Sequence, residues 1–189
     1  VVINVAHLTG RAEGDNPHVW YDPKAMPAMA NALTVALGAL DPEGKATFEE
    51  NRDAFLTTLA PIEARVADLR QRFAGTPVVA TEPVFGYMAE ALGLKMENER
   101  FQTAIMNETE PAAGDIAAME DAIRDGKVRI LFYNAQVEDA FTENLAELAR
   151  SAGVPIVPVT ETQPQGKGFA EWMLDTIDAV GKALGDKTS

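Results

Sequence analysis

One of the chain's two histidines lies in a segment that can present it for chemistry. The eight residues from Asn16 to Pro23 read NPHVWYDP, and they place His18 just before a run with helical spacing. The aromatic side chains of Trp20 and Tyr21 can anchor such a loop in apolar packing. A neutral imidazole held this way suits a metal ligand or a catalytic base, but packed or hydrogen-bonded loop histidines are also common. The spacing alone leaves both roles open.

Polar side chains follow three segments that read as buried strands. Glu82 follows the first, Asn134 and Gln136 follow the second, and Thr160 and Glu161 follow the third. Ligands of open parallel α/β sheets bind at the carboxyl ends of the strands. We therefore expect these side chains on one rim of a sheet.

Each of these candidates also has a simpler role. Glu82 precedes a proline-started helix, so its carboxylate is either a ligand or a partner of the helix N-terminus. Glu161 can be merely solvated, and His7 reads as a surface histidine. His18 and Glu82 offer one nitrogen and one oxygen donor, a pair that suits Zn²⁺ or Mn²⁺. A complete site normally takes three or four protein ligands, so this pair alone falls short of one.

Composition and motifs narrow the function classes. The chain has no cysteine and carries none of the HExxH, GxSxG or glycine-rich phosphate-loop patterns, so catalysis has little support. A formal net charge of -13 argues against nucleic acid and anionic membrane surfaces as partners. There is no apolar run long enough for a transmembrane helix. The chain starts without methionine in VVINV, which suggests a processed chain or a fragment.

The first half of the chain reads as helical. Asp22-Pro23 is typical of an N-cap followed by a first-turn proline, and helical spacing continues to Leu40 through an apolar series that includes Leu33. A second run from about Glu43 to Phe73 predicts a helix of roughly 45 Å, with a kink at Pro61. A coiled coil and a helix that lies across two lobes both fit this length.

The second half alternates between strands and helices. Residues 95–106 are ambiguous and can hold a further strand. Apolar runs and glycine stops predict strands at 77–81, 128–133 and 154–159, and helices at 83–92, 112–125, 138–152 and 169–184. Alternation with short links indicates right-handed parallel βαβ units, so the fold class is α/β.

Taken in order, these motifs resemble a known family. NPHVWYDP, the long helix, TEPVFGYMAEALGL, VRILFYNAQV, AGVPIVPVTET and FAEWMLDTIDAVGKAL together are similar to the TroA/ZnuA-like substrate-binding proteins of bacterial zinc and manganese ABC transporters. The resemblance covers nearly the whole chain, and NPHVWYDP is its most specific part. It implies two α/β lobes joined by one rigid helix, with a metal ion held between the lobes.

The resemblance assigns roles and boundaries in this sequence. It implies that residues 1–41 are the tail of an N-terminal lobe with a metal-site loop, that 42–74 are the bridging helix, and that 75–189 are the C-terminal lobe. His18 matches the motif histidine and becomes a metal ligand. Glu82 stands where the family usually has histidine, and Thr160, with Glu161 beside it, aligns with a late aspartate of the family.

The function implied by the resemblance is binding without catalysis. A periplasmic or otherwise extracytoplasmic monomer would capture zinc, or alternatively manganese, and deliver it to an ABC permease in the inner membrane. Zinc is expected first because imidazole and the affinity order favour it, while the glutamate favours manganese. Two rivals stay open: a binding protein of the same fold for a non-metal or chelated small ligand, and a metal-assisted hydrolase that uses His18 and Glu82.

Overall fold

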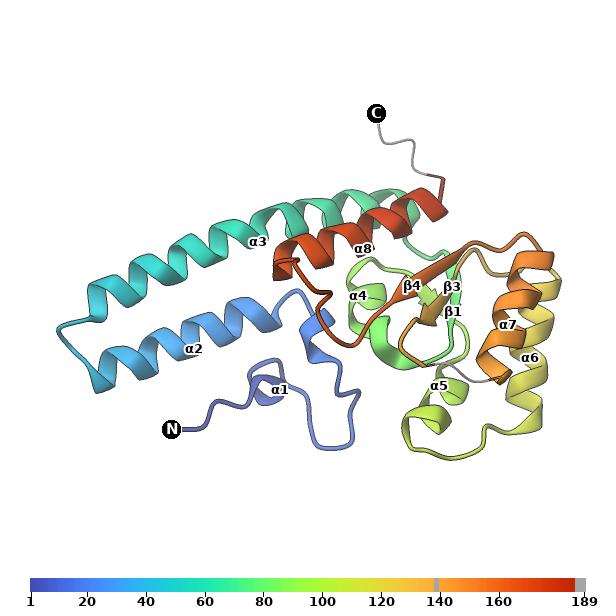
Figure 1. The fold of residues 1–189 in the computed structure, drawn as a ribbon, viewed down its shortest axis with the longest axis horizontal. Coiled ribbons are helices and arrows are strands. Elements are labelled where there is room, and N and C mark those ends of the chain that lie inside the picture. Colours follow the sequence, from blue (N-terminus) through green and yellow to red (C-terminus); the bar gives the residue numbers. More distant parts are fainter. Residues whose placement is uncertain (138–139, 186–189) are drawn as a thin grey trace.

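The chain folds into a small parallel sheet, covered by helices, from which a pair of long helices projects (Figure 1). The computed structural model describes residues 1–137 and 140–185. Its helices are α1 (Val5–Leu8), α2 (Ala25–Leu40), α3 (Lys45–Phe73), α4 (Gly86–Ala91), α5 (Glu99–Met106), α6 (Ala113–Arg124), α7 (Ala140–Ser151) and α8 (Phe169–Ala183), with 3₁₀ turns η1 (Val19–Tyr21) and η2 (Pro83–Phe85). Its strands are β1 (Pro77–Ala80), β2 (Lys95–Met96), β3 (Leu131–Asn134) and β4 (Ile156–Val159).

The four strands form one sheet in the order β2-β1-β3-β4, and every neighbouring pair is parallel. Val79 of β1 faces Leu131 of β3, and Asn134 at the end of β3 faces Val159 of β4. Because all strands point the same way, their carboxyl ends meet at one edge. The predicted α/β class with parallel βαβ units is confirmed.

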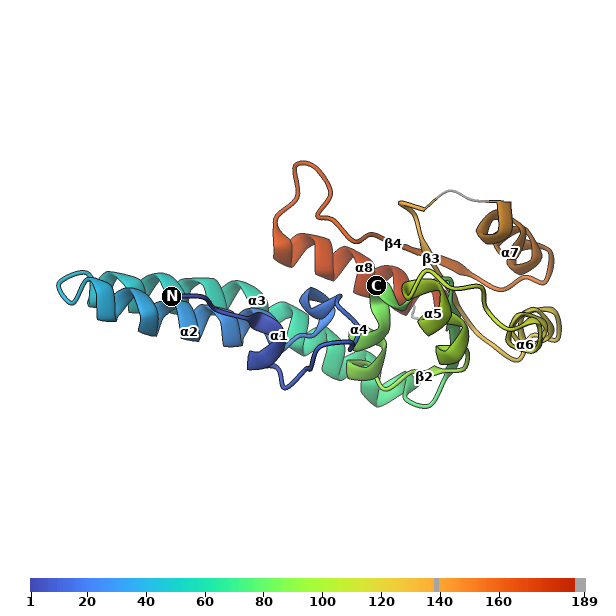
Figure 2. The ribbon, with the colours of Figure 1, turned by 90° about the horizontal axis from the view of Figure 1, so that it is seen from below.

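Two hydrophobic cores cover the two faces of the sheet. Successive residues of a strand point to opposite faces of the sheet, so they alternate between the two cores. Val78 and Ala80 belong to the first core and Val79 belongs to the second. The first core is built mainly with α3, α4 and α8, and the second with α5, α6 and α7. Figure 2 shows these two helical layers on opposite sides of the strands.

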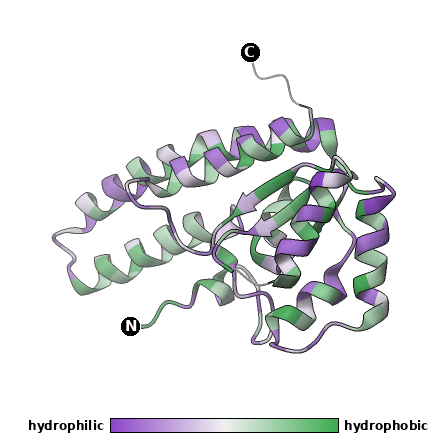
Figure 3. Ribbon diagram, turned by 45° about the vertical axis from the view of Figure 1, so that its right-hand side comes forward, coloured by the Kyte–Doolittle hydropathy of each residue, from purple (hydrophilic) through white to green (hydrophobic). Residues whose placement is uncertain are grey.

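Helices α2 and α3 form an antiparallel pair, which we call the helical arm, and the arm extends away from the sheet (Figures 1 and 2). At its root α3 lies beside α8, and Leu59, Ile62 and Leu69 are buried in the first core. Toward its tip the apolar side chains of Leu33 and Leu40 are exposed. Figure 3 accordingly shows hydrophobic residues along much of α2.

Several sequence-based boundaries need correction. Helix α2 begins at Ala25 with Lys24 at the N-cap, so Asp22 is not the cap residue. The Asp22 carboxylate still accepts a hydrogen bond from the Lys24 backbone N–H at 3.0 Å, and this bond closes the turn just before the helix. The apolar series through Leu33 and Leu40 is not the buried face of α2, since the residues that are buried there are Ala25, Ala30 and Thr34.

The second half shows smaller differences. The strands predicted to start at 128 and 154 begin at Leu131 and Ile156. The helix predicted from 83 starts as a 3₁₀ turn before α4, and residues 95–106 hold both the short β2 and α5. Helix α3 runs continuously through Pro61. Residues 138–139, where one helix was expected to start, lie outside the described part of the chain. No helix among the described residues is both long and apolar enough to cross a membrane.

Candidate functional site

The carboxyl ends of β1, β3 and β4 bring together two of the predicted acidic residues. The side-chain amide of Asn134, at the end of β3, donates to Glu82 Oε2 and to Glu161 Oε1, both at 2.8 Å. Asn134 is only 2% exposed, and its own backbone N–H donates to Thr81 Oγ1 at 3.1 Å. One buried amide therefore holds two carboxylates that are far apart in the sequence.

Glu82 stands at the N-cap position of η2 but does not cap it. Its backbone is extended, and its carboxylate makes no hydrogen bond to the backbone N–H groups of the turn. The carboxylate instead accepts from Asn134. Of the two roles considered for Glu82, the structure removes the simple cap.

The loop that carries Glu161 is fixed by a second amide. Gln136 Oε1 accepts the backbone N–H of Glu161 at 2.6 Å and that of Thr162 at 3.0 Å, and its Nε2 donates to Thr162 Oγ1 at 2.6 Å. Glu161 is thus held through its backbone by Gln136 and through its side chain by Asn134.

His18 is 7% exposed and approaches the same edge from the N-terminal segment. Its imidazole packs edge-on against Trp20, with ring centroids 5.3 Å apart. Burial lowers the pKa of His18, and the negative charge of Glu161 partly opposes this by raising it. The lowered pKa favours the neutral imidazole, which is the form that binds a metal ion, and His18 lies close enough to Glu161 to feel its charge. We call His18, Glu82, Asn134 and Glu161 the sheet-edge cluster.

Thr160 contributes its backbone to this region. Its carbonyl accepts the Tyr21 hydroxyl at 2.9 Å, which ties the His18 segment to the loop after β4. Burial raises the pKa of Tyr21 to about 12, so the hydroxyl remains a donor. The Thr160 hydroxyl is enclosed and has no hydrogen-bond partner among the described residues.

Asn16 links the His18 loop to the segment that follows Glu82. Its Oδ1 accepts the His18 backbone N–H at 3.1 Å and lies 2.6 Å from His18 Nδ1. Its Nδ2 donates to the Pro83 carbonyl at 2.6 Å, and its own carbonyl accepts the Tyr87 hydroxyl at 2.7 Å.

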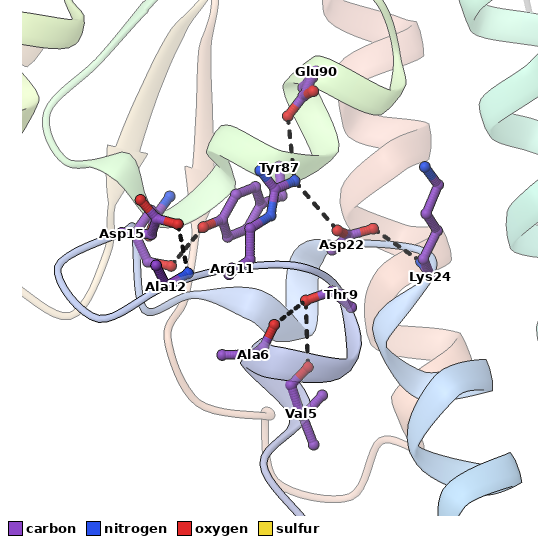
Figure 4. Close-up of polar contacts among 11 residues, drawn as sticks. Val5, Ala6, Thr9, Arg11, Ala12, Asp15, Asp22, Lys24, Tyr87 and Glu90 are labelled. Atoms are coloured by element: carbon purple, nitrogen blue, oxygen red, sulfur yellow. Dashed lines mark hydrogen bonds and ion pairs between the residues drawn. The ribbon is translucent and has the colours of Figure 1, made fainter.

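Arg11 adds a second connection on the same side (Figure 4). Its guanidinium lies 4.1 Å from the centre of the Tyr87 ring and forms ion pairs with Asp22 at 3.4 Å and Glu90 at 3.6 Å. The N-terminal segment is thereby attached to α4, the helix that follows Glu82. Asn16 and Arg11 were not predicted from the sequence. Asn16 opens the NPHVWYDP motif, and its place two residues before a candidate ligand is the signal that could have identified it.

The other predicted histidine lies elsewhere. His7 is exposed on the short α1 and takes no part in the cluster, as expected for a surface residue. Within the described residues, no group of three or more His, Asp or Glu side chains converges tightly enough to hold a metal ion. The cluster thus offers one imidazole and two carboxylates on neighbouring loops, oriented by amides but not drawn together as a closed coordination sphere.

Known proteins match this chain over nearly its whole length. The family described as ZnuA, "Zinc-uptake complex component A periplasmic", matches residues 2–183. The chain belongs to the ZnuA family. The resemblance seen in the sequence is therefore confirmed.

Individual relatives are distant in sequence. The high-affinity zinc uptake system protein ZnuA of Haemophilus influenzae is 26% identical over 174 residues, which are 89% of this chain and 50% of the relative. The zinc-binding lipoprotein AdcA of Streptococcus pneumoniae is 25% identical over 87% of this chain and 33% of its own length. The metal ABC transporter lipoprotein SsaB of Streptococcus sanguinis is 24% identical over 96% of this chain and 60% of the relative. The chain thus spans about one third to three fifths of these relatives.

A solved structure shares the fold. The periplasmic zinc-binding protein TroA from Treponema pallidum superposes with a TM-score of 0.74 at 22% identity, over 97% of this chain and 72% of TroA. At this identity the likeness concerns the fold alone.

Proposed function

We propose that this chain is part of the substrate-binding protein of a metal-ion ABC importer, with a divalent cation as its cargo. Membership in the ZnuA family supports binding and delivery rather than catalysis, with zinc as the cargo. Manganese enters as an alternative cargo because a similar protein, PsaA of Streptococcus mitis, is named a manganese ABC transporter lipoprotein. In this proposal residues 1–41 are the tail of an N-terminal lobe, 42–74 the bridging helix and 75–189 the C-terminal lobe. The protein acts in the periplasm or another extracytoplasmic space, as a monomer that meets a permease of the inner membrane.

The observation that carries the proposal is the sheet-edge cluster itself. His18, Glu82 and Glu161 arrive from three separate loops, and each is held by an amide side chain: Asn16 for His18, and Asn134 for both glutamates. Ligands of metal sites are typically held by such outer hydrogen bonds, which fix their orientation.

We assign the three donors as one imidazole nitrogen from His18 and one carboxylate each from Glu82 and Glu161. Glu161 is preferred over Thr160, because the Thr160 hydroxyl is enclosed and its carbonyl is engaged by Tyr21. Imidazole and the general affinity order favour zinc, while two carboxylates make the site harder and increase its tolerance of manganese. We propose zinc as the preferred ion and manganese as the competitor.

The two histidines of the chain provide a matched experiment. Zinc affinity is measured by competition with a fluorescent chelator for the wild-type chain, His18→Ala and His7→Ala. We expect binding on the order of micromolar for the wild type and for His7→Ala. We expect a loss of at least about 100-fold for His18→Ala, because a primary ligand is removed. Equal affinities of all three proteins, or loss in His7→Ala alone, would overturn the assignment.

A further inference from the structure

The side chain of Asn16 contacts two backbone groups whose hydrogen-bonding character is fixed. One side of its amide meets the His18 backbone N–H, which can only donate, at 3.1 Å. The other side meets the Pro83 carbonyl, which can only accept, at 2.6 Å. An amide flipped by 180° would place NH₂ against N–H and oxygen against oxygen. The two backbone groups therefore determine which atom of Asn16 is oxygen and which is nitrogen.

This orientation has a consequence for the imidazole. The atom that lies 2.6 Å from His18 Nδ1 is Asn16 Oδ1, which has no hydrogen to donate. The contact is a hydrogen bond only when Nδ1 carries the hydrogen. In the neutral imidazole the other nitrogen, Nε2, then has a bare lone pair. A lone pair is what a metal cation requires.

The same amide reaches the second candidate ligand. Pro83, whose carbonyl accepts from Asn16, directly follows Glu82 in the chain. The Asn16 backbone is in turn held by the Tyr87 hydroxyl, and the Tyr87 ring is covered by Arg11 (Figure 4). A Cβ added at Gly86 would come within 3.1 Å of Asn16 Nδ2, so the turn after Pro83 closes around this amide. Asn16 thus lies at the junction of the His18 loop and the Glu82 turn.

We propose that Asn16 is a positioning residue that sets the Nδ1–H tautomer of His18 and fixes the spacing between His18 and Glu82. It does not touch the cargo. Its oxygen selects which imidazole nitrogen is available, and its NH₂ group ties the imidazole loop to the backbone beside the carboxylate. This inference rests on the proposed function for its purpose, but the tautomer itself is a property of the metal-free chain.

The tautomer is measured directly by two-bond ¹H–¹⁵N correlation spectra of the metal-free, ¹⁵N-labelled chain at about pH 8, well above the reference pKa of an imidazole. Only two imidazoles contribute, which makes the assignment simple, and exposed His7 is an internal reference. We expect His18 as Nδ1–H and His7 as a mixture dominated by the Nε2–H form that solvated histidines prefer. A wild-type His18 in the Nε2–H form would overturn the inference.

Variants separate the two roles of Asn16. Asn16→Ala should release His18 to a mixture like that of His7 and weaken zinc binding about 10-fold or more. Asn16→Asp keeps an acceptor for Nδ1–H and loses the donor to Pro83, so we expect the tautomer to persist while affinity still falls. If Asn16→Ala does not fold, the zinc affinity of Asn16→Asp tests the role of the Asn16 side chain. Asn98→Ala removes another buried amide, one that bonds Ala80, and should leave the His18 tautomer unchanged.

The possible failures are distinguishable. Persistence of the Nδ1–H form in Asn16→Ala, or its loss in Asn98→Ala, would overturn the role of Asn16 whatever the metal titrations show. Absence of zinc and manganese binding by the wild-type chain, with the tautomer as expected, would instead overturn the proposed function.

Discussion

The sheet-edge cluster and the helical arm are built by opposite means. In the arm, α2 and α3 are continuous helices that pack along their length, and at the root Leu69 is 1% exposed. In the cluster, three side chains, those of His18, Glu82 and Glu161, come from separate segments and are held by hydrogen bonds with the side-chain amides of Asn16 and Asn134. We infer that the arm contributes stability and the cluster contributes specificity, so mutations in the two regions should affect different measurements.

The largest effect on stability is expected at the root of the arm. Leu69→Ala removes a fully buried side chain and should lower the free energy of unfolding by about 3 kcal/mol. Leu40→Ala at the tip, where the side chain is 72% exposed, is the matched control and should cost less than about 0.5 kcal/mol. Urea unfolding monitored by circular dichroism measures both. Similar losses at root and tip would contradict the packing described here.

The next effect concerns the carboxylates and should appear in binding. Glu82→Ala and Glu161→Ala should each weaken zinc binding by about 10- to 100-fold, or roughly 1.4 to 2.8 kcal/mol, because each removes a ligand. Neither should change the free energy of unfolding by more than about 1 kcal/mol, since both side chains are partly exposed. Isothermal calorimetry and urea unfolding on the same samples separate the two quantities. A Glu82→Ala variant that kept its zinc affinity would remove Glu82 from the site.

Replacing the Glu82 carboxylate with an imidazole tests whether residue 82 contacts the metal ion. Glu82→His should keep binding and shift the preference from manganese toward zinc, because imidazole is the softer donor. Competition between the two ions, read by elemental analysis after dialysis against an equal mixture, gives the ratio. An unchanged ratio would mean that residue 82 does not contact the ion.

A smaller effect on binding is expected from the shared amide. Asn134→Ala should weaken zinc binding about 10-fold, since the two glutamates lose their common donor. Asn98→Ala is the control, because Asn98 is also buried and bonds the backbone of Ala80. Both variants should lose about 2 kcal/mol of stability, but only Asn134→Ala should lose affinity. Equal affinity losses would show that Asn134 acts through general stability alone.

The smallest effect is the pH dependence contributed by His18. Burial lowers its pKa in the folded chain, so the unfolded chain takes up the proton first as the pH falls below about 6.5. The contribution of His18 to stability is therefore present above that pH and is lost as the pH falls through the folded-state value. His18→Gln should flatten the decline of unfolding free energy between about pH 7 and pH 5. An identical decline in His18→Gln and wild type would contradict the described burial.

Much of the fold could be predicted because its signals are local. The apolar spacing through Leu59, Ile62 and Leu69 predicted a long helix, and glycines after the helices marked their ends. Buried runs with Val78 and Leu131 predicted the parallel strands. The apolar spacing of α2 predicted the helix but does not mark its buried face, because small residues such as Ala30 are buried there instead.

The candidate site was less predictable because it depends on contacts across the chain. The candidate ligands were predicted from their places after strands and in one motif. The hydrogen-bond network that orients them was not predicted, since Asn16 and Pro83 are 67 residues apart and Asn134 and Glu82 are 52 apart. Nothing in the local sequence specifies which amide meets which carboxylate. Only the parallel register of β1, β3 and β4 brings them to one edge.

The central claim, that His18 is the single imidazole ligand beside carboxylate oxygens, is tested most directly by X-ray absorption spectroscopy of the zinc-loaded chain. The chain has only two histidines, so the count of imidazoles in the outer-shell scattering is decisive. We predict one imidazole at a Zn–N distance of about 2.0 Å, with the remaining nearest neighbours oxygen, and loss of the imidazole signal in His18→Ala. Two imidazoles, none, or a signal that survives in His18→Ala would contradict the account.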